Sequence, residues 1–85
     1  MTETRETRIK RMKMRSMRRG IKEMDLILSA YADRHLDSMD AAALDTYDAL
    51  LRENDQDLYQ WVTGQAAAPA ALSDLIGDIA QTFQK

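Results

Sequence analysis

The residues with the most unusual combination of types lie at the end of the first quarter of the chain. Arg18 and Arg19 precede Gly20, and two acids, Glu23 and Asp25, follow it. A glycine inside a helix costs roughly 1 kcal/mol relative to alanine, so Gly20 indicates a helix break or a close approach of another backbone. The helix dipole favours Glu23 one turn into the second helix, but it does not account for Arg19 at the same positive end. The pattern therefore predicts that Arg19 is exposed and binds a partner.

Other residue types that carry chemistry have no partners at a useful spacing. His35 is the only histidine and the chain has no cysteine, so no metal site is expected within one chain. At a helix end, His35 is expected to contact the last carbonyls instead. The serines lack the G-x-S-x-G context of a nucleophile, and no glycine-rich phosphate loop is present. We expect no catalytic residue and no enzymatic activity.

A run of acids in the middle of the chain has a simpler interpretation than a metal site. It lacks both the spacing and the glycine of a calcium loop, so a solvated face accounts for it better than a metal or a basic partner. The acids are Asp45, Asp48, Glu53, Asp55 and Asp57.

Length and composition predict a small domain with a thin core. A chain of 85 residues is expected to form one domain that buries roughly 60% of the surface exposed by the unfolded chain. No apolar run approaches the roughly 20 residues of a membrane span, and no apolar segment of a secretory signal follows the N-terminal charges. These features predict a cytoplasmic monomer that does not insert into a membrane.

The charges are separated along the chain. Residues 1–22 hold nine Lys and Arg against two Glu, a net charge of +7, whereas residues 23–85 carry a net charge of −9. The basic arm can be a solvated helix, a nucleic-acid-binding arm, or a surface for an acidic or anionic-cofactor-bearing protein. Residues 1–20 contain no aromatic for base stacking, and the later helices are acidic, so nucleic acid is the weaker choice.

The hydrophobic pattern has helical spacing throughout and no period of two. It predicts an all-α single domain over residues 1–85, a bundle of four to five short helices. Residues 1–18 form a basic N-terminal helix or arm, Ser38 or Asp40 caps a third helix, and Gly64 ends a fourth. Residues 65–69 are a short linker before the last helix. The apolar stripe of the first helix is expected to contain Ile9, Met12 and Met17, and the core to contain Tyr31, Leu44, Tyr47, Leu51, Leu58 and Trp61.

Two blocks of the sequence carry a resemblance to a known family. Arg19-Gly20-Ile21-Lys22-Glu23 looks like the R-G-x-x-E signature of the succinate dehydrogenase flavinylation and assembly factors, the SdhE/YgfY-like family. The similarity extends to Arg15-Ser16 before it and Met24 to Leu28 after it. Asp55 to Gly64, with Tyr47 to Leu51 ahead of it, resembles the second block, so the match covers roughly residues 8–64. One departure is that Met14 and Met17 stand where many members carry an aromatic residue.

The resemblance implies a five-helix assembly factor, or chaperone, that is not itself an enzyme. Such factors bind the flavoprotein subunit of succinate dehydrogenase, and in some bacteria that of fumarate reductase, and promote covalent attachment of FAD to it. This chain would hold no cofactor stably, because FAD stays with the partner. The implied partner-binding residues are Arg19, Gly20 and Glu23, with Arg18 and Asp25 as neighbours. An alternative from a different class is a small nucleic-acid-binding or antitoxin-like regulator that uses the basic arm.

Overall fold

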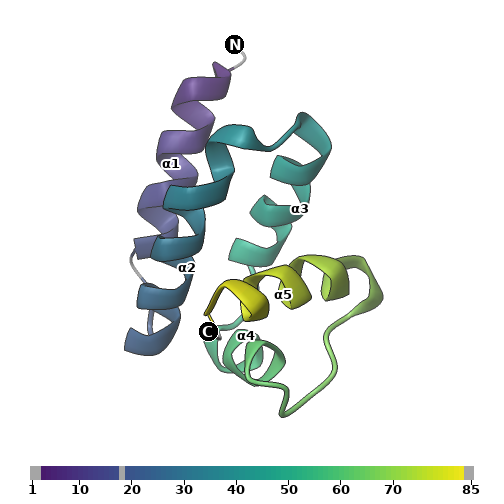
Figure 1. Cartoon of the computed structure of the whole chain (residues 1–85). Coiled ribbons are helices and arrows are strands. Elements are labelled where there is room, and N and C mark those ends of the chain that lie inside the picture. Colours follow the sequence, from purple (N-terminus) through teal and green to yellow (C-terminus); the bar gives the residue numbers. More distant parts are fainter. Residues whose placement is uncertain (1–2, 18, 84–85) are drawn as a thin grey trace.

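The computed structural model describes residues 3–17 and 19–83, and these residues form helices and no strand (Figure 1). The predicted all-α fold is confirmed. The helices are α1 (Arg5–Met17), α2 (Lys22–His35), α3 (Ala41–Leu51), α4 (Asp55–Val62) and α5 (Ala70–Phe83), with a 3-10 turn, η1 (Leu36–Ser38), between α2 and α3. In Figure 1, α1 and α2 form an antiparallel pair, and α4 and α5 lie together at one end of the molecule.

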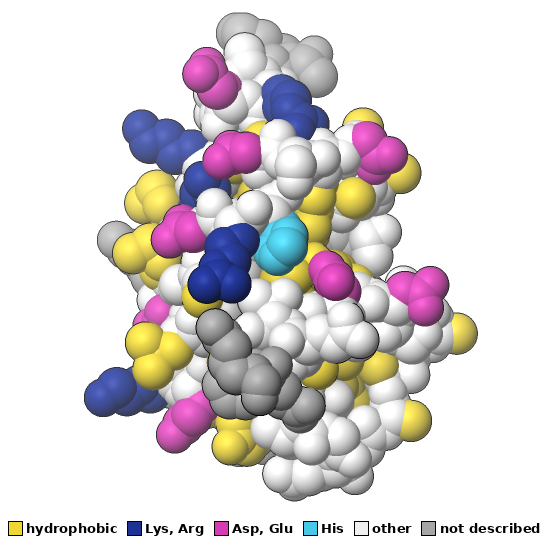
Figure 2. All heavy atoms as spheres, in the orientation of Figure 1, with side chains coloured by type: hydrophobic (Ala, Val, Ile, Leu, Met, Phe, Trp, Pro, Cys, Tyr) yellow, Lys and Arg dark blue, Asp and Glu magenta, His cyan; other side chains and the backbone are white. Residues whose placement is uncertain are grey.

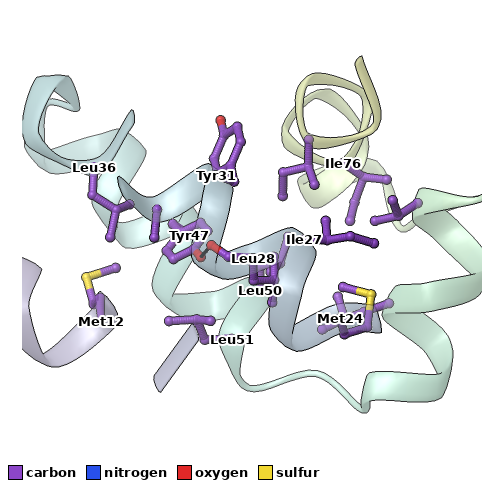
Figure 3. Packing of buried hydrophobic residues seen from close by; sticks show 14 of the residues in the cluster. Met12, Met24, Ile27, Leu28, Tyr31, Leu36, Tyr47, Leu50, Leu51 and Ile76 are labelled. Atoms are coloured by element: carbon purple, nitrogen blue, oxygen red, sulfur yellow. Dashed lines mark hydrogen bonds between the residues drawn. The ribbon is translucent and has the colours of Figure 1, made fainter. Parts of the chain in front are cut away.

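Helix α2 is the centre of the bundle, because it contacts α1, α4 and α5. Its buried residues recur at helical spacing, from Met24 through Ile27 and Leu28 to Tyr31, and so form one continuous face. Figure 3 shows this face packed against Tyr47, Leu50 and Leu51 of α3 and Ile76 of α5. Of the predicted core, Tyr31, Leu44, Tyr47, Leu51 and Leu58 are buried as expected.

Two predicted core positions are wrong. Met17 is 56% exposed, because the buried stripe of α1 continues from Ile9 and Met12 to Ser16. The hydroxyl of Ser16 donates to the Met12 carbonyl at 2.8 Å and shares a 2.6 Å hydrogen bond with the Tyr47 hydroxyl, so a polar side chain is satisfied there. Trp61 is only half-buried and packs against the outside of the core.

Helix ends follow the expected signals. Of the two candidates for the start of α3, Asp40 is the cap, since its side chain accepts a 2.8 Å hydrogen bond from the Ala43 amide. Asn54 caps α4 in the same way through the Gln56 amide. Gly64 has a φ of +82°, the left-handed conformation that stops α4 and that glycine adopts at little cost. These signals fix the starts of α3 and α4 and the stop of α4, and the start of α4 lies beside the loop between α1 and α2.

Candidate functional site

The loop between α1 and α2 carries the arginine and glycine that the sequence singled out. We call residues 19–21 the junction loop. Ile21 is extended, with φ −109° and ψ 125°, and no side chain caps the first turn of α2. A helix start without a side-chain cap leaves nearby backbone N–H groups in need of other acceptors, so contacts from other helices must hold the loop in place.

Those contacts come from Asp55, the first residue of α4. Its Oδ2 accepts a short hydrogen bond from the Gly20 amide and a 3.3 Å hydrogen bond from the Ile21 amide. Its Oδ1 lies 2.7 Å from Nε and 2.6 Å from Nη2 of Arg19. A single carboxylate therefore holds three consecutive residues that precede it by 34 to 36 positions.

Arg19 lies at the boundary of two helices and is not the exposed arginine that the sequence predicted. Its side chain is 10% exposed, and besides the pair with Asp55 it donates to the carbonyls of Leu51 at 3.0 Å and Glu53 at 3.2 Å. These carbonyls lie at the C-terminal end of α3, where the helix dipole favours a cation, while Asp55 lies at the positive end of α4. The two helix ends and the ion pair have complementary charge, which accounts for an arginine that helix α2 alone did not explain.

Gly20 is exposed, but the space beside its Cα is restricted. A Cβ at this position would lie 3.2 Å from Oδ2 of Asp55. Of the described glycines only Gly64 has a positive φ, so Gly20 is needed for space and not for an unusual backbone conformation. The sequence predicted a helix break or a close approach of another backbone at Gly20, and the neighbour in the folded chain is a carboxylate side chain.

The remaining predicted residues differ in their surroundings. Glu23 is exposed in the first turn of α2, and no ion pair or side-chain hydrogen bond involves it within residues 3–17 and 19–83. Asp25 is half-buried and accepts a 3.3 Å hydrogen bond from the Ser29 hydroxyl. Arg18 lies outside the described residues. The structure thus brings Arg19 and Gly20 together on Asp55, and it places Glu23 on the surface one turn away, with no side-chain partner among the described residues.

Exposed apolar side chains flank the junction loop. Met14 and Met17 of α1 are 48% and 56% exposed, and Leu26 of α2 is 63% exposed. Met14 also lines a shallow depression together with the stem of Arg19. Large exposed apolar side chains gathered near one loop are typical of a protein-binding surface.

The basic helix α1 is largely neutralised within the chain. Arg8 pairs with Asp45 at 2.6 Å and Arg15 with Asp48 at 2.9 Å, so the acidic side of α3 faces the basic side of α1. At the surface, Arg11 lowers the pKa of the Glu3 carboxyl through a bidentate contact. Figure 2 shows basic and acidic side chains interspersed over the visible face, with no continuous basic surface there. The prediction of a solvated acidic face is wrong for Asp48 and Asp55, whose side chains are only 17% and 14% exposed.

Elsewhere, the described residues show no site with a reaction chemistry of its own. No three His, Asp or Glu side chains among them are placed to hold a metal ion. No described helix has both the length and the apolar composition needed to cross a membrane. His35, at the end of α2, stacks on Tyr31 with ring centroids 4.4 Å apart, and the Tyr31 hydroxyl donates to Asp78 at 2.6 Å. The junction loop is therefore the candidate functional site among the described residues.

Comparisons with known proteins identify the family of the chain. The model of the family described as the flavinator of succinate dehydrogenase matches residues 10–83. A relative named mitochondrial succinate dehydrogenase assembly factor 2, from Meyerozyma guilliermondii, is 52% identical over 61 residues, which cover 72% of this chain and 45% of the relative. The protein of the same name in Candida glabrata is 58% identical over 56% of this chain and 31% of the relative. The one in Schizosaccharomyces pombe is 42% identical over 79% of this chain and 48% of the relative.

These relatives overturn one expectation and set the extent of the match. A cytoplasmic protein was expected, but each of these relatives is named as mitochondrial. The chain spans less than half the length of these relatives. The matched segment nevertheless includes the junction loop, Asp55 and α2 to α5. The chain belongs to the succinate dehydrogenase flavinator family.

Proposed function

We propose that this protein is an FAD assembly factor that binds the flavoprotein subunit of succinate dehydrogenase and promotes covalent attachment of FAD to it. The family match over residues 10–83 is the observation that carries this proposal. The protein acts as a monomeric chaperone and not as an enzyme. FAD remains with the flavoprotein, and the bond-forming chemistry belongs to that partner.

The surface around the junction loop suits such a partner. The Gly20 backbone is exposed and held by Asp55, Glu23 carries a free charge, and Met17 and Leu26 offer apolar area on either side. Interfaces of this kind combine an apolar centre with a few charged contacts that fix the docked orientation. Docking here would hold the flavoprotein in the conformation in which its own residues react with FAD.

The test is flavinylation of the dehydrogenase subunit in cells whose only assembly factor is this chain or a variant of it. We expect Glu23→Ala to lower covalent flavin, measured as in-gel fluorescence after denaturation, because truncating one member of a buried interface pair costs about 2–5 kcal/mol. Glu6→Ala is the matched control. Glu6 is also an exposed glutamate in the first turn of a helix, at the end of α1 away from the junction loop. Both variants should melt like the wild type.

Two outcomes would contradict the proposal at different levels. If cells without the factor made fully flavinylated subunit, the function would be wrong. If flavinylation required the factor but the Glu23→Ala variant still supported it fully, the function would stand and the assigned surface would be wrong. The same assay with the fumarate reductase flavoprotein determines whether that subunit is a second client.

A further inference from the structure

Asp55 is the one described acceptor for the two amides of the junction loop. The amides of Gly20 and Ile21 both donate to its Oδ2, and the described residues offer them no backbone acceptor. Asp55 belongs to a different helix and lies 35 residues beyond Gly20. The conformation of the loop therefore depends on where α4 places this carboxylate.

We propose that Asp55 is a positioning residue for flavoprotein docking: it fixes the backbone of residues 19–21, and thereby the presentation of Gly20 and Glu23 to the partner. This inference rests on the proposed function and adds to it a residue outside the surface that the partner touches. It also makes the start of α4 a support for the docking surface.

The ion pair with Arg19 gives the carboxylate a fixed position. Both side chains are at most 14% exposed, so solvent and salt screen the pair less than they screen the surface pairs of α1. Arg19 in turn binds the carbonyl of Leu51, the last residue of α3, and that of Glu53 just beyond it, so the pair ties the loop to the end of α3 and the start of α4. Moving the loop would require breaking these contacts together.

Arg19 then supports the docking surface without contacting the partner. Its Nε, Nη1 and Nη2 each have an acceptor inside the chain. A partner that approached Gly20 and Glu23 would meet a backbone and a free carboxylate, while the guanidinium stays with Asp55 and α3. The prediction that Arg19 is exposed and binds a partner is replaced by this arrangement.

The experiment compares Asp55→Asn with Asp57→Asn in the full chain. Asp57 is also in the first turn of α4 but is exposed, so its change removes the same charge from the helix end without touching the loop. We expect Asp55→Asn to speed exchange of the Gly20 and Ile21 amides at least tenfold by NMR, and to weaken flavoprotein binding at least tenfold. Core amides should keep their protection, and Asp57→Asn should change neither quantity.

Asp55→Glu separates position from charge. It keeps the negative charge for Arg19 and α4 but displaces the acceptor by one methylene. A purely electrostatic or folding role predicts that Asp55→Glu restores binding, whereas positioning predicts that binding stays at least fivefold weaker while melting returns toward the wild type. If Asp55→Asn did not fold, Asp55→Glu would still provide this comparison.

Three results would overturn the inference. One is an Asp55 variant that binds the flavoprotein with wild-type affinity although its Gly20 amide exchanges quickly. Another is an Asp55 variant that loses affinity although its Gly20 and Ile21 amides exchange at the wild-type rate. In either case the wild type still binds, so the proposed function survives. If the wild-type chain itself failed to bind the flavoprotein, the proposed function would fall and the inference with it.

Discussion

At the scale of single residues, Gly20 and Gly77 make a matched pair. Gly77 lies inside α5, and a Cβ there would meet nothing within 4 Å. Gly77→Ala should therefore stabilise the protein by roughly 0.5–1 kcal/mol, the usual gain for alanine over glycine in a helix. At Gly20, a Cβ would lie 3.2 Å from Oδ2 of Asp55, which two backbone amides hold in place while Arg19 holds Oδ1.

We therefore expect Gly20→Ala to give no gain and to lower the free energy of unfolding by about 1 kcal/mol, the scale of one weakened hydrogen bond. The measurement is urea denaturation of both variants and the wild type. A gain at Gly20 equal to that at Gly77 would mean that Asp55 moves aside freely. This expectation differs from one based on the sequence alone, in which an exposed Gly20 tolerates a large side chain without loss of stability.

The sequence could identify the positions of the site but not their contacts. The Arg19–Gly20–Glu23 spacing was visible because these residues are neighbours in the chain. Asp55 was assigned to a solvated acidic face, because only the fold brings α4 against a loop 34 to 36 residues earlier. Asp55 follows a capping asparagine and begins the second block of the family resemblance, but neither signal indicates a contact with the junction loop.

At the scale of helices, periodicity predicted the elements well and the buried face of α1 less well. Helix α2 could be read from its apolar spacing, and the starts and stops at Asp40 and Gly64 from capping chemistry. The last turn of the buried face of α1 could not, because Ser16 is polar and hydrogen-bonds to Tyr47 of α3 as well as to the Met12 carbonyl. The tertiary hydrogen bond is visible only in the fold, and it places Ser16 in the core where the sequence predicted Met17.

The burial of Tyr47 predicts loss of stability at alkaline pH. Burial raises the pKa of Tyr47 to about 12, while an exposed tyrosine in the unfolded chain titrates near 10. The folded state therefore holds a proton that the unfolded state loses, so the stabilisation is complete below about pH 10 and declines as pH rises toward 12. The slope from this group is at most about 1.4 kcal/mol per pH unit.

Melting temperatures between pH 8 and pH 11.5 test this for the wild type and Tyr47→Phe. We expect Tyr47→Phe to be less stable at pH 8 by about 1 kcal/mol, because the hydrogen bond with Ser16 is lost, but to lose less stability per pH unit above pH 10. Some alkaline loss should remain, because burial also raises the pKa of Tyr31. Parallel curves for the two proteins would rule out Tyr47 as a source of the alkaline loss.

At the scale of the whole molecule, folding brings the separated charges of the sequence together. Residues 1–22 carry +7 and the remainder −9, but α1 lies against α3 and pairs Arg8 and Arg15 with its acids. The folded chain therefore presents much less positive charge than its first 22 residues would present alone. This arrangement disfavours the alternative of a nucleic-acid-binding arm, because the cations nearest α3 already have partners.

A peptide of residues 1–22 should consequently bind duplex DNA at least tenfold more tightly than the folded chain at the same salt concentration. Its affinity should fall steeply with added salt as counterions are released, while the folded chain shows a shallower slope. A folded double variant, Asp45→Asn with Asp48→Asn, frees Arg8 and Arg15 and should recover part of the difference. Equal affinity of peptide and folded chain would show that α1 remains available to nucleic acid. That result would favour the alternative of a small nucleic-acid-binding regulator. Fluorescence anisotropy with one labelled duplex measures all three.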